Sequence, residues 1–332
     1  MNPSFSGYVR KHGLPFMGLF LILAPLFLED YQKIFLAEIL IWGLFAMGFD
    51  LVFGYTGMLS FCQALFFGAG AYGTAYAIFF LNAGIWTSVG FSVLVGGSLA
   101  LLVGYLATRV SGHYFMIITI IFSVLIHLVL QSGHWRWLTG GYGGRPLPTP
   151  VVSLGFTTLS FMNELVSYYF VALFVGAAYL LARLIVRSQV GIMLECIREN
   201  EMKARLIGYN IERVKLLIFV FAGGLSGLAG SLYSLLIRYT NLAFFEWELS
   251  GQAVVWTLLG GAGTLIGPFI GSTLYWLSSE LLSTSFKSFP IIFGILLIVV
   301  VLTFPGGIMG YLKKYLGFFE DQNKSIKEVK LY

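Results

Sequence analysis

Three long stretches without a charged side chain constrain this chain more than any other feature of its sequence. No Asp, Glu, Lys or Arg occurs in residues 51–108, 249–279 or 288–312. A helix needs about 20 apolar residues to cross the hydrocarbon core of a bilayer, so the first stretch alone has room for two spans. The charged fraction, 11%, is less than half of the roughly 25% found in ordinary soluble domains. We therefore expect a protein embedded in a lipid bilayer.

The apolar stretches are continuous, which distinguishes helices from the strands of a membrane barrel. Only helices and closed barrels satisfy their backbone polar groups in lipid. Barrel strands alternate apolar and polar residues over about 10 positions, whereas residues 291–300 read Ile-Ile-Phe-Gly-Ile-Leu-Leu-Ile-Val-Val. The expected fold class is all-α, a polytopic bundle of transmembrane helices.

Ten apolar segments fit the chain as spans, and their basic flanks indicate one orientation. Basic residues mark cytoplasmic ends, and they gather at Arg10 and Lys11, in the loop 189–215, and at Lys313 and Lys314. An even number of spans returns all three clusters, and both termini, to the cytoplasm. The predicted spans are 13–28, 34–53, 61–81, 84–107, 112–131, 164–186, 215–237, 245–261, 266–284 and 289–305.

One transmembrane domain is expected over residues 1–318, followed by a polar cytoplasmic tail over 319–332. Residues 13–28 follow two basic residues as a signal sequence would, but no small-residue cleavage motif comes after them, so a retained first span is favoured. Gly267 and Pro268 interrupt an apolar stretch. The segments 245–261 and 266–284 are therefore either two full spans or a re-entrant pair.

The motifs that would mark an enzyme are absent or misplaced. Residues 68–73 read Gly-Ala-Gly-Ala-Tyr-Gly, but a dinucleotide site needs this pattern between a strand and a helix. Residues 140–144 are glycine-rich without the Lys-Ser/Thr of a phosphate-binding loop. The four histidines lack metal-ligand spacing, and Cys62 and Cys196 suggest neither a disulfide nor a metal site. We expect no catalytic site, metal or cofactor, and because the basic residues gather at span ends we expect no nucleic-acid partner.

The sequence offers no acid–base pair of the kind that would drive an ion-coupled carrier. Secondary transporters bury acid–base pairs at mid-depth to carry coupled ions. Glu38 and Asp50 both lie near the ends of the predicted span 34–53, and no acid–base pair is found at mid-depth. A carrier or channel that acts alone is therefore the less favoured alternative.

Glycine is abundant, with 40 residues, and several glycines lie four positions apart. Small residues let membrane helices approach closely. Helix packing is favoured over the lining of a narrow path for Gly223, Gly227, Gly263, Gly267 and Gly271.

The strongest functional feature is the charged loop 189–215. Glu199 with Lys203, and Glu201 with Arg205, are spaced for ion pairs along an exposed helix, and Gly208 is a typical stop signal. We predict a short amphipathic helix, which either inserts into a groove of a cytoplasmic partner or serves only as a solvated connector. Its apolar side would carry Met193, Ile197, Ala204 and Ile207.

That loop resembles the coupling segment of ATP-binding-cassette (ABC) importer permeases. More closely, the chain resembles the branched-chain amino acid permease family, the M-type subunit of the high-affinity Leu/Ile/Val system. Four blocks carry the resemblance over most of the chain. They read Asp-Leu-Val-Phe-Gly-Tyr-Thr-Gly at 50–57, continuing to 72; Leu-Thr-Gly-Gly-Tyr-Gly-Gly at 138–144; Arg-Glu-Asn-Glu at 198–201, continuing to 233; and Leu-Gly-Gly-Ala-Gly-Thr-Leu-Ile-Gly-Pro at 259–268, with Phe-Pro-Gly-Gly at 304–307.

Two positions depart from the family pattern and leave the solute open. Cys62-Gln63 stands where the family often has Gly-His, and residues 142–145 read Tyr-Gly-Gly-Arg where a small polar residue and Gly-Leu usually follow. A permease for urea or short amides is the alternative within the same group.

The resemblance implies an importer of several chains with the type II ABC-importer arrangement, working by alternating access in the bacterial inner membrane. A second, homologous permease subunit would complete the pore, two cytoplasmic ABC ATPase subunits would bind the coupling helices, and a periplasmic or surface solute-binding protein would deliver the solute. The residues expected to couple to the ATPases are Glu195, Arg198, Glu199, Glu201, Ala204, Arg205 and Gly208. Those expected along the translocation path are Tyr55, Thr56, Ser60, Gln63, Tyr72 and Thr139.

Overall fold

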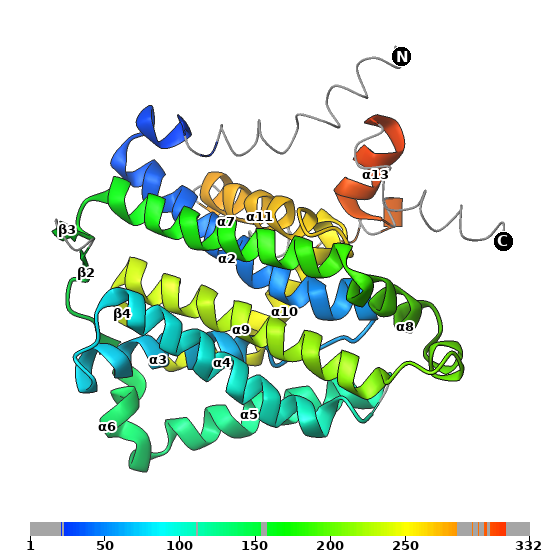
Figure 1. Ribbon diagram of the computed structural model, residues 1–332. Helices are drawn as coiled ribbons and strands as arrows, with labels where there is room; N and C mark the ends of the chain where they lie inside the picture. Colours follow the sequence, from blue (N-terminus) through cyan, green and yellow to red (C-terminus); the bar gives the residue numbers. More distant parts are fainter. Residues whose placement is uncertain are drawn as a thin grey trace.

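The computed structural model is mostly helical, and it describes residues 21, 23–110, 112–153, 158–283, 294, 298, 302–303 and 306–316 (Figure 1). Its longer helices are α2 (Asp30–Thr56), α3 (Gln63–Phe80), α4 (Ile85–Ala107), α5 (His113–Gln131), α7 (Glu164–Arg187), α8 (Gln189–Leu206), α9 (Ile211–Ile237), α10 (Trp247–Gly260), α11 (Gly267–Ser283) and α13 (Gly307–Leu316). Its short elements are α6 (Arg136–Thr139), the 3-10 turns η1 (Ala24–Leu26), η2 (Gly133–Trp135), η3 (Gly141–Gly143) and η4 (Leu242–Phe245), and the antiparallel strand pairs β1 (Arg145–Pro146) with β4 (Tyr239–Thr240) and β2 (Val151–Ser153) with β3 (Thr158–Ser160).

Each predicted span between residues 34 and 284 coincides with a described helix. Five of these helices, α2, α4, α5, α7 and α9, are long and apolar enough to cross a membrane. α10 and α11 are shorter, at 14 and 17 residues. Residues 13–20 and 22 of the predicted span 13–28, most of 289–305 and the tail 319–332 lie outside the described residues, so the count of ten spans and the type II arrangement stay predictions.

Helix α9 lies at the centre of the bundle, packed against α2, α3 and α4 (Figure 1). Glycine makes these contacts close. A methyl group on Gly227 would come within 3.1 Å of the Gly96 Cα atom on α4, and one on Gly70 of α3 would overlap the Gly227 carbonyl. α2 and α9 are buried along most of their apolar length, whereas only 17% of the apolar stretch of α5 is buried. The exposed apolar faces are therefore available to lipid or to another membrane protein.

A non-helical segment separates α2 from α3. α2 ends where Gly57 adopts a positive φ of 76°, a conformation that favours glycine because it has no Cβ atom. Hydroxyl groups then supply partners for the backbone, since Phe61 N donates to Thr119 Oγ1 at 3.1 Å and Ala64 N donates to Ser250 Oγ at 2.9 Å. Lipid offers no hydrogen bonds, so such partners allow irregular backbone to be buried inside a bundle.

Candidate functional site

Helix α8 forms from the charged loop, and it is two helical pieces joined at a kink. Asn200 has extended backbone angles, φ −163° and ψ 102°, within the helix. Its side-chain oxygen accepts a hydrogen bond from Lys203 N at 3.0 Å and so caps the second piece. α8 ends at Leu206, and the turn to α9 contains Gly208 with a φ of 97°.

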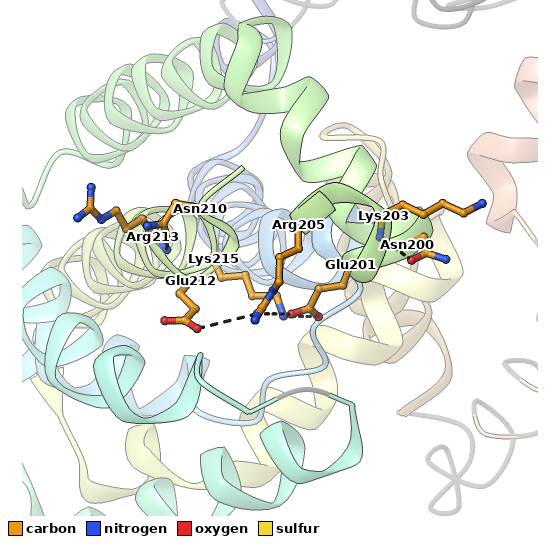
Figure 2. Close-up of polar contacts among 8 residues, drawn as sticks. All are labelled: Asn200, Glu201, Lys203, Arg205, Asn210, Glu212, Arg213 and Lys215. Atoms are coloured by element: carbon orange, nitrogen blue, oxygen red, sulfur yellow. Dashed lines mark hydrogen bonds and ion pairs between the residues drawn. The ribbon is translucent and has the colours of Figure 1, made fainter. Parts of the chain in front are cut away.

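Four charged side chains connect the second piece of α8 to the start of α9 (Figure 2). Lys215 Nζ lies 2.6 Å from Glu201 Oε2, and only 3% of the lysine side chain is exposed. Arg205 joins this pair at the surface, 4.0 Å from Glu201 and 3.9 Å from Glu212. The Glu201–Lys215 bond fixes α8 to α9, because a buried ammonium group needs a nearby partner.

The structure differs from two of the expectations for this helix. Glu199 and Lys203 form no ion pair among the described residues, because extended backbone at Asn200 breaks the helical spacing between them. Ile207 was expected on the apolar side with Ile197 and Ala204, but its side chain is exposed while the other two are buried.

Three large apolar side chains project from the second piece of α8 and from the turn after it. Met202, Leu206 and Ile207 are 72%, 82% and 70% exposed, although charged residues surround them. Sequence reasoning missed Met202 and Leu206, whose i,i+4 spacing was the available signal. Among the residues predicted for coupling, Glu199 and Arg205 are also exposed, Glu195 is half-buried, and Ala204 is fully covered.

The first piece of α8 contacts two other segments through Arg198. Its Nη1 atom donates a hydrogen bond to the Gly54 carbonyl in the last turn of α2. Asp50, one turn earlier and fully buried, accepts a hydrogen bond from Gly263 N at 2.7 Å. Three of the four sequence blocks therefore meet here. Gly263 lies in the turn between α10 and α11 with a φ of 76°, so it is not part of a helical packing step as predicted.

The remaining predicted packing glycines lie at close helix approaches. A methyl group on Gly223 would overlap the Ala100 side chain of α4, and one on Gly271 of α11 would overlap the Trp256 carbonyl of α10. Gly267 begins α11 beside Gly261, so the Gly267–Gly271 step faces α10.

The residues predicted for the translocation path are all buried in the single chain. Tyr72 donates a hydrogen bond to the Thr139 carbonyl at 3.1 Å, and Ser226 of α9 donates to Gln63 Oε1 at 2.8 Å. The Gln63 Nε2 atom has no hydrogen-bond partner among the described residues. The full set, Tyr55, Thr56, Ser60, Gln63, Tyr72 and Thr139, exposes at most 5% of any member.

Metal-binding clusters are not found in the part of the chain that the structure describes. No group of three or more His, Cys, Asp or Glu side chains lies close enough to hold an ion there. Cys62 is buried, Cys196 is half-buried, and both are free thiols. The chemistry of the described site therefore consists of ion pairs, helix ends and exposed apolar side chains.

The family model and the similar proteins all describe permeases of transport systems. Residues 33–304 match the family model described as "Branched-chain amino acid transport system / permease component". The chain is 24% identical to the high-affinity branched-chain amino acid transport system permease protein LivM of Salmonella typhimurium, over 97% of this chain and 80% of that protein. It is 26% identical to the LivH permease protein of the same organism, over 81% and 91% respectively. It is 27% identical to the autoinducer 2 import system permease protein LsrC of Yersinia pseudotuberculosis, over 58% and 56%. No solved structure matches.

Proposed function

The chain belongs to the branched-chain amino acid transport system permease family, and from this premise we propose that it is the permease subunit of an ABC importer for branched-chain amino acids or related small polar solutes. Relatives in the family are permease components of transport systems. ATP hydrolysis is then the task of partner chains. The names of the relatives favour an amino acid over urea or a short amide as the solute.

The observation that carries the proposal is the apolar tip of α8, formed by Met202, Leu206 and Ile207. Large apolar side chains that are 70–82% exposed among charged neighbours are typical of a surface that a protein partner covers. A short helix that presents such side chains fits an apolar groove on a partner. The partner proposed for this tip is the cytoplasmic ABC ATPase.

Motion of the ATPase would reach the spans through α8. Ser188 joins α8 directly to α7, and the Glu201–Lys215 bond joins it to α9. Since α9 packs closely on α2, α3 and α4, displacement of its first turn moves the centre of the bundle. Alternating access then follows from a tilt of these helices. The six path residues stay part of the proposal, and because they are buried the solute would reach them only after the helices move.

The remaining partners follow from the same premise. A second, homologous permease would cover exposed apolar surface, and a periplasmic or surface solute-binding protein would dock on the outer loops. The location is the bacterial inner membrane, with both termini in the cytoplasm.

Co-purification of the full chain in detergent tests this function. An ATPase and a second permease should be recovered with it, and ATP-driven uptake should follow reconstitution with the solute-binding protein. Leu206→Ser combined with Ile207→Ser should reduce ATPase recovery severalfold while the permease stays folded, because both side chains are exposed. Arg213→Ala is the matched control, since this exposed side chain extends away from Arg205 and Glu201 of α8 (Figure 2). Full recovery of the ATPase together with full uptake in the double variant would contradict the proposal.

A further inference from the structure

We propose that Arg198 is a positioning residue that ties the first piece of α8 to the end of α2 and to the α10–α11 turn. The inference rests on the proposed importer function and names a second connection between the ATPase-binding helix and the spans. The observation that carries it is the meeting of Arg198, Gly54, Asp50 and Gly263 at one point.

The last carbonyls of α2 have no helical donors, and Arg198 supplies a donor to one of them. The N–H of Gly57 bonds to the Phe53 carbonyl at 2.9 Å, and the N–H of Met58 bonds to the Val52 carbonyl at 3.3 Å. The Gly54 carbonyl receives the Arg198 guanidinium instead. A cation at a helix C-terminus is also attracted by the partial negative charge of the last carbonyls, so this bond fixes α8 to α2.

The contact extends to the α10–α11 turn because the end of α2 and this turn approach each other closely at Gly54 and Gly263. A methyl group on Gly54 would overlap both the Asp50 carboxylate and Gly263 N, and one on Gly263 would lie 3.0 Å from Arg198 Nη1. The hydrogen bond from Gly263 N to Asp50 holds the turn against α2. A displacement of Arg198 therefore acts on α2 and on the turn together.

The kink at Asn200 separates this connection from the one to α9. Arg198 precedes the kink, and Glu201, which holds Lys215, follows it. Loss of Arg198 should leave the α9 connection and the apolar tip in place. The ATPase should then still bind and hydrolyse ATP, while less of its motion reaches α2, α10 and α11.

Arg198→Ala in the purified chain and in the co-purified importer tests the proposal. In the chain, amide hydrogen exchange should become about tenfold faster in residues 52–62 and 261–266, the change expected when one hydrogen bond from a charged donor is lost. In the importer, solute taken up per ATP hydrolysed should fall by a similar factor with ATPase recovery unchanged. Arg198→Lys keeps the cation at the helix end and should retain part of the coupling. Arg213→Ala should change neither measurement.

Gly54→Ala provides a second test that keeps the arginine. Its methyl group should push the turn away from Asp50 and reproduce both effects, whereas Gly251→Ala should be silent because a methyl there meets only the Phe61 ring, at 3.8 Å. Unchanged exchange and coupling in Arg198→Ala, or an equal fall of uptake and hydrolysis, would overturn the positioning role. If no ATPase is recovered with the unmodified chain, the importer function fails, and the exchange measurement still decides whether Arg198 holds these segments together.

Discussion

At the scale of single residues, the two members of the Glu201–Lys215 pair differ in exposure: the lysine is buried and the glutamate is one-third exposed. Glu201→Ala should lower the stability of the purified chain by about 1–3 kcal/mol, since it leaves a buried ammonium group without its partner. Lys215→Met should cost less, about 1 kcal/mol or below, because an apolar side chain suits the buried position and Glu201 still has water and Arg205 nearby.

Thermal unfolding in detergent measures this difference. Arg205→Ala is the control, and it should have little effect because its side chain is 59% exposed and its two ion pairs are long. A larger loss of stability for Lys215→Met than for Glu201→Ala would show that the geometry of this pair is wrong.

The pattern of residues in the charged loop predicted a helix but not its internal break. Asn200 was the available signal, because an Asn side chain competes with the helix for backbone hydrogen bonds. The contact from Arg198 to Gly54 was beyond sequence reasoning, since a carbonyl 144 positions away has no signature in composition or spacing. Asp50 was recognised only as an acid near a span end, whereas it is a buried acceptor for the α10–α11 turn.

At the scale of elements, the close approach of α3 and α9 depends on glycines that meet backbone atoms. A methyl group on Gly70 would overlap the Gly227 carbonyl, and one on Gly230 would overlap the Phe67 carbonyl. Alanine at either position should force the helices apart and cost about 1–3 kcal/mol. The melting temperature in detergent, with uptake as a second measurement, tests this expectation.

Gly90 on α4 and Gly176 on α7 are matched controls, because a methyl group at either site meets nothing within 4 Å. Alanine there should be neutral or stabilise the chain by up to about 1 kcal/mol, since glycine is a poor helix former. Equal effects at all four positions would contradict packing as the reason for the glycines of α3 and α9.

Hydropathy located the helices of the predicted spans between residues 34 and 284, because each span must satisfy its own backbone in lipid. Hydropathy did not predict which of these helices pack against one another. The four-residue spacing of glycines predicted that Gly263 packs between helices, but Gly263 lies in a turn. The prediction was wrong because a GxxxG pattern does not show where a helix begins. The choice between full spans and a re-entrant pair for α10 and α11 likewise depends on depth, which hydropathy does not give.

At the scale of the whole molecule, α7 offers a direct measurement of orientation. Its 24 residues extend about 36 Å at 1.5 Å per residue, enough to cross a hydrocarbon core of about 30 Å. Met162 before α7 and Lys203 in α8 are both exposed, so cysteines at these positions should face opposite sides of the membrane. The native cysteines must not react with the thiol reagent used for labelling. Cys62 is buried and can stay, whereas the half-buried Cys196 is replaced by serine.

A membrane-impermeant maleimide applied to intact cells should label Met162→Cys and should label Lys203→Cys only after permeabilisation. The expectation follows from the basic residues that cluster around α8, since such clusters stay in the cytoplasm. The opposite pattern would reverse the orientation and would place the apolar tip of α8 outside the cell, where no ATP-hydrolysing partner can reach it. Labelling of both positions in intact cells would mean that α7 does not cross the membrane, and transmission of motion from α8 to the spans would then need another route.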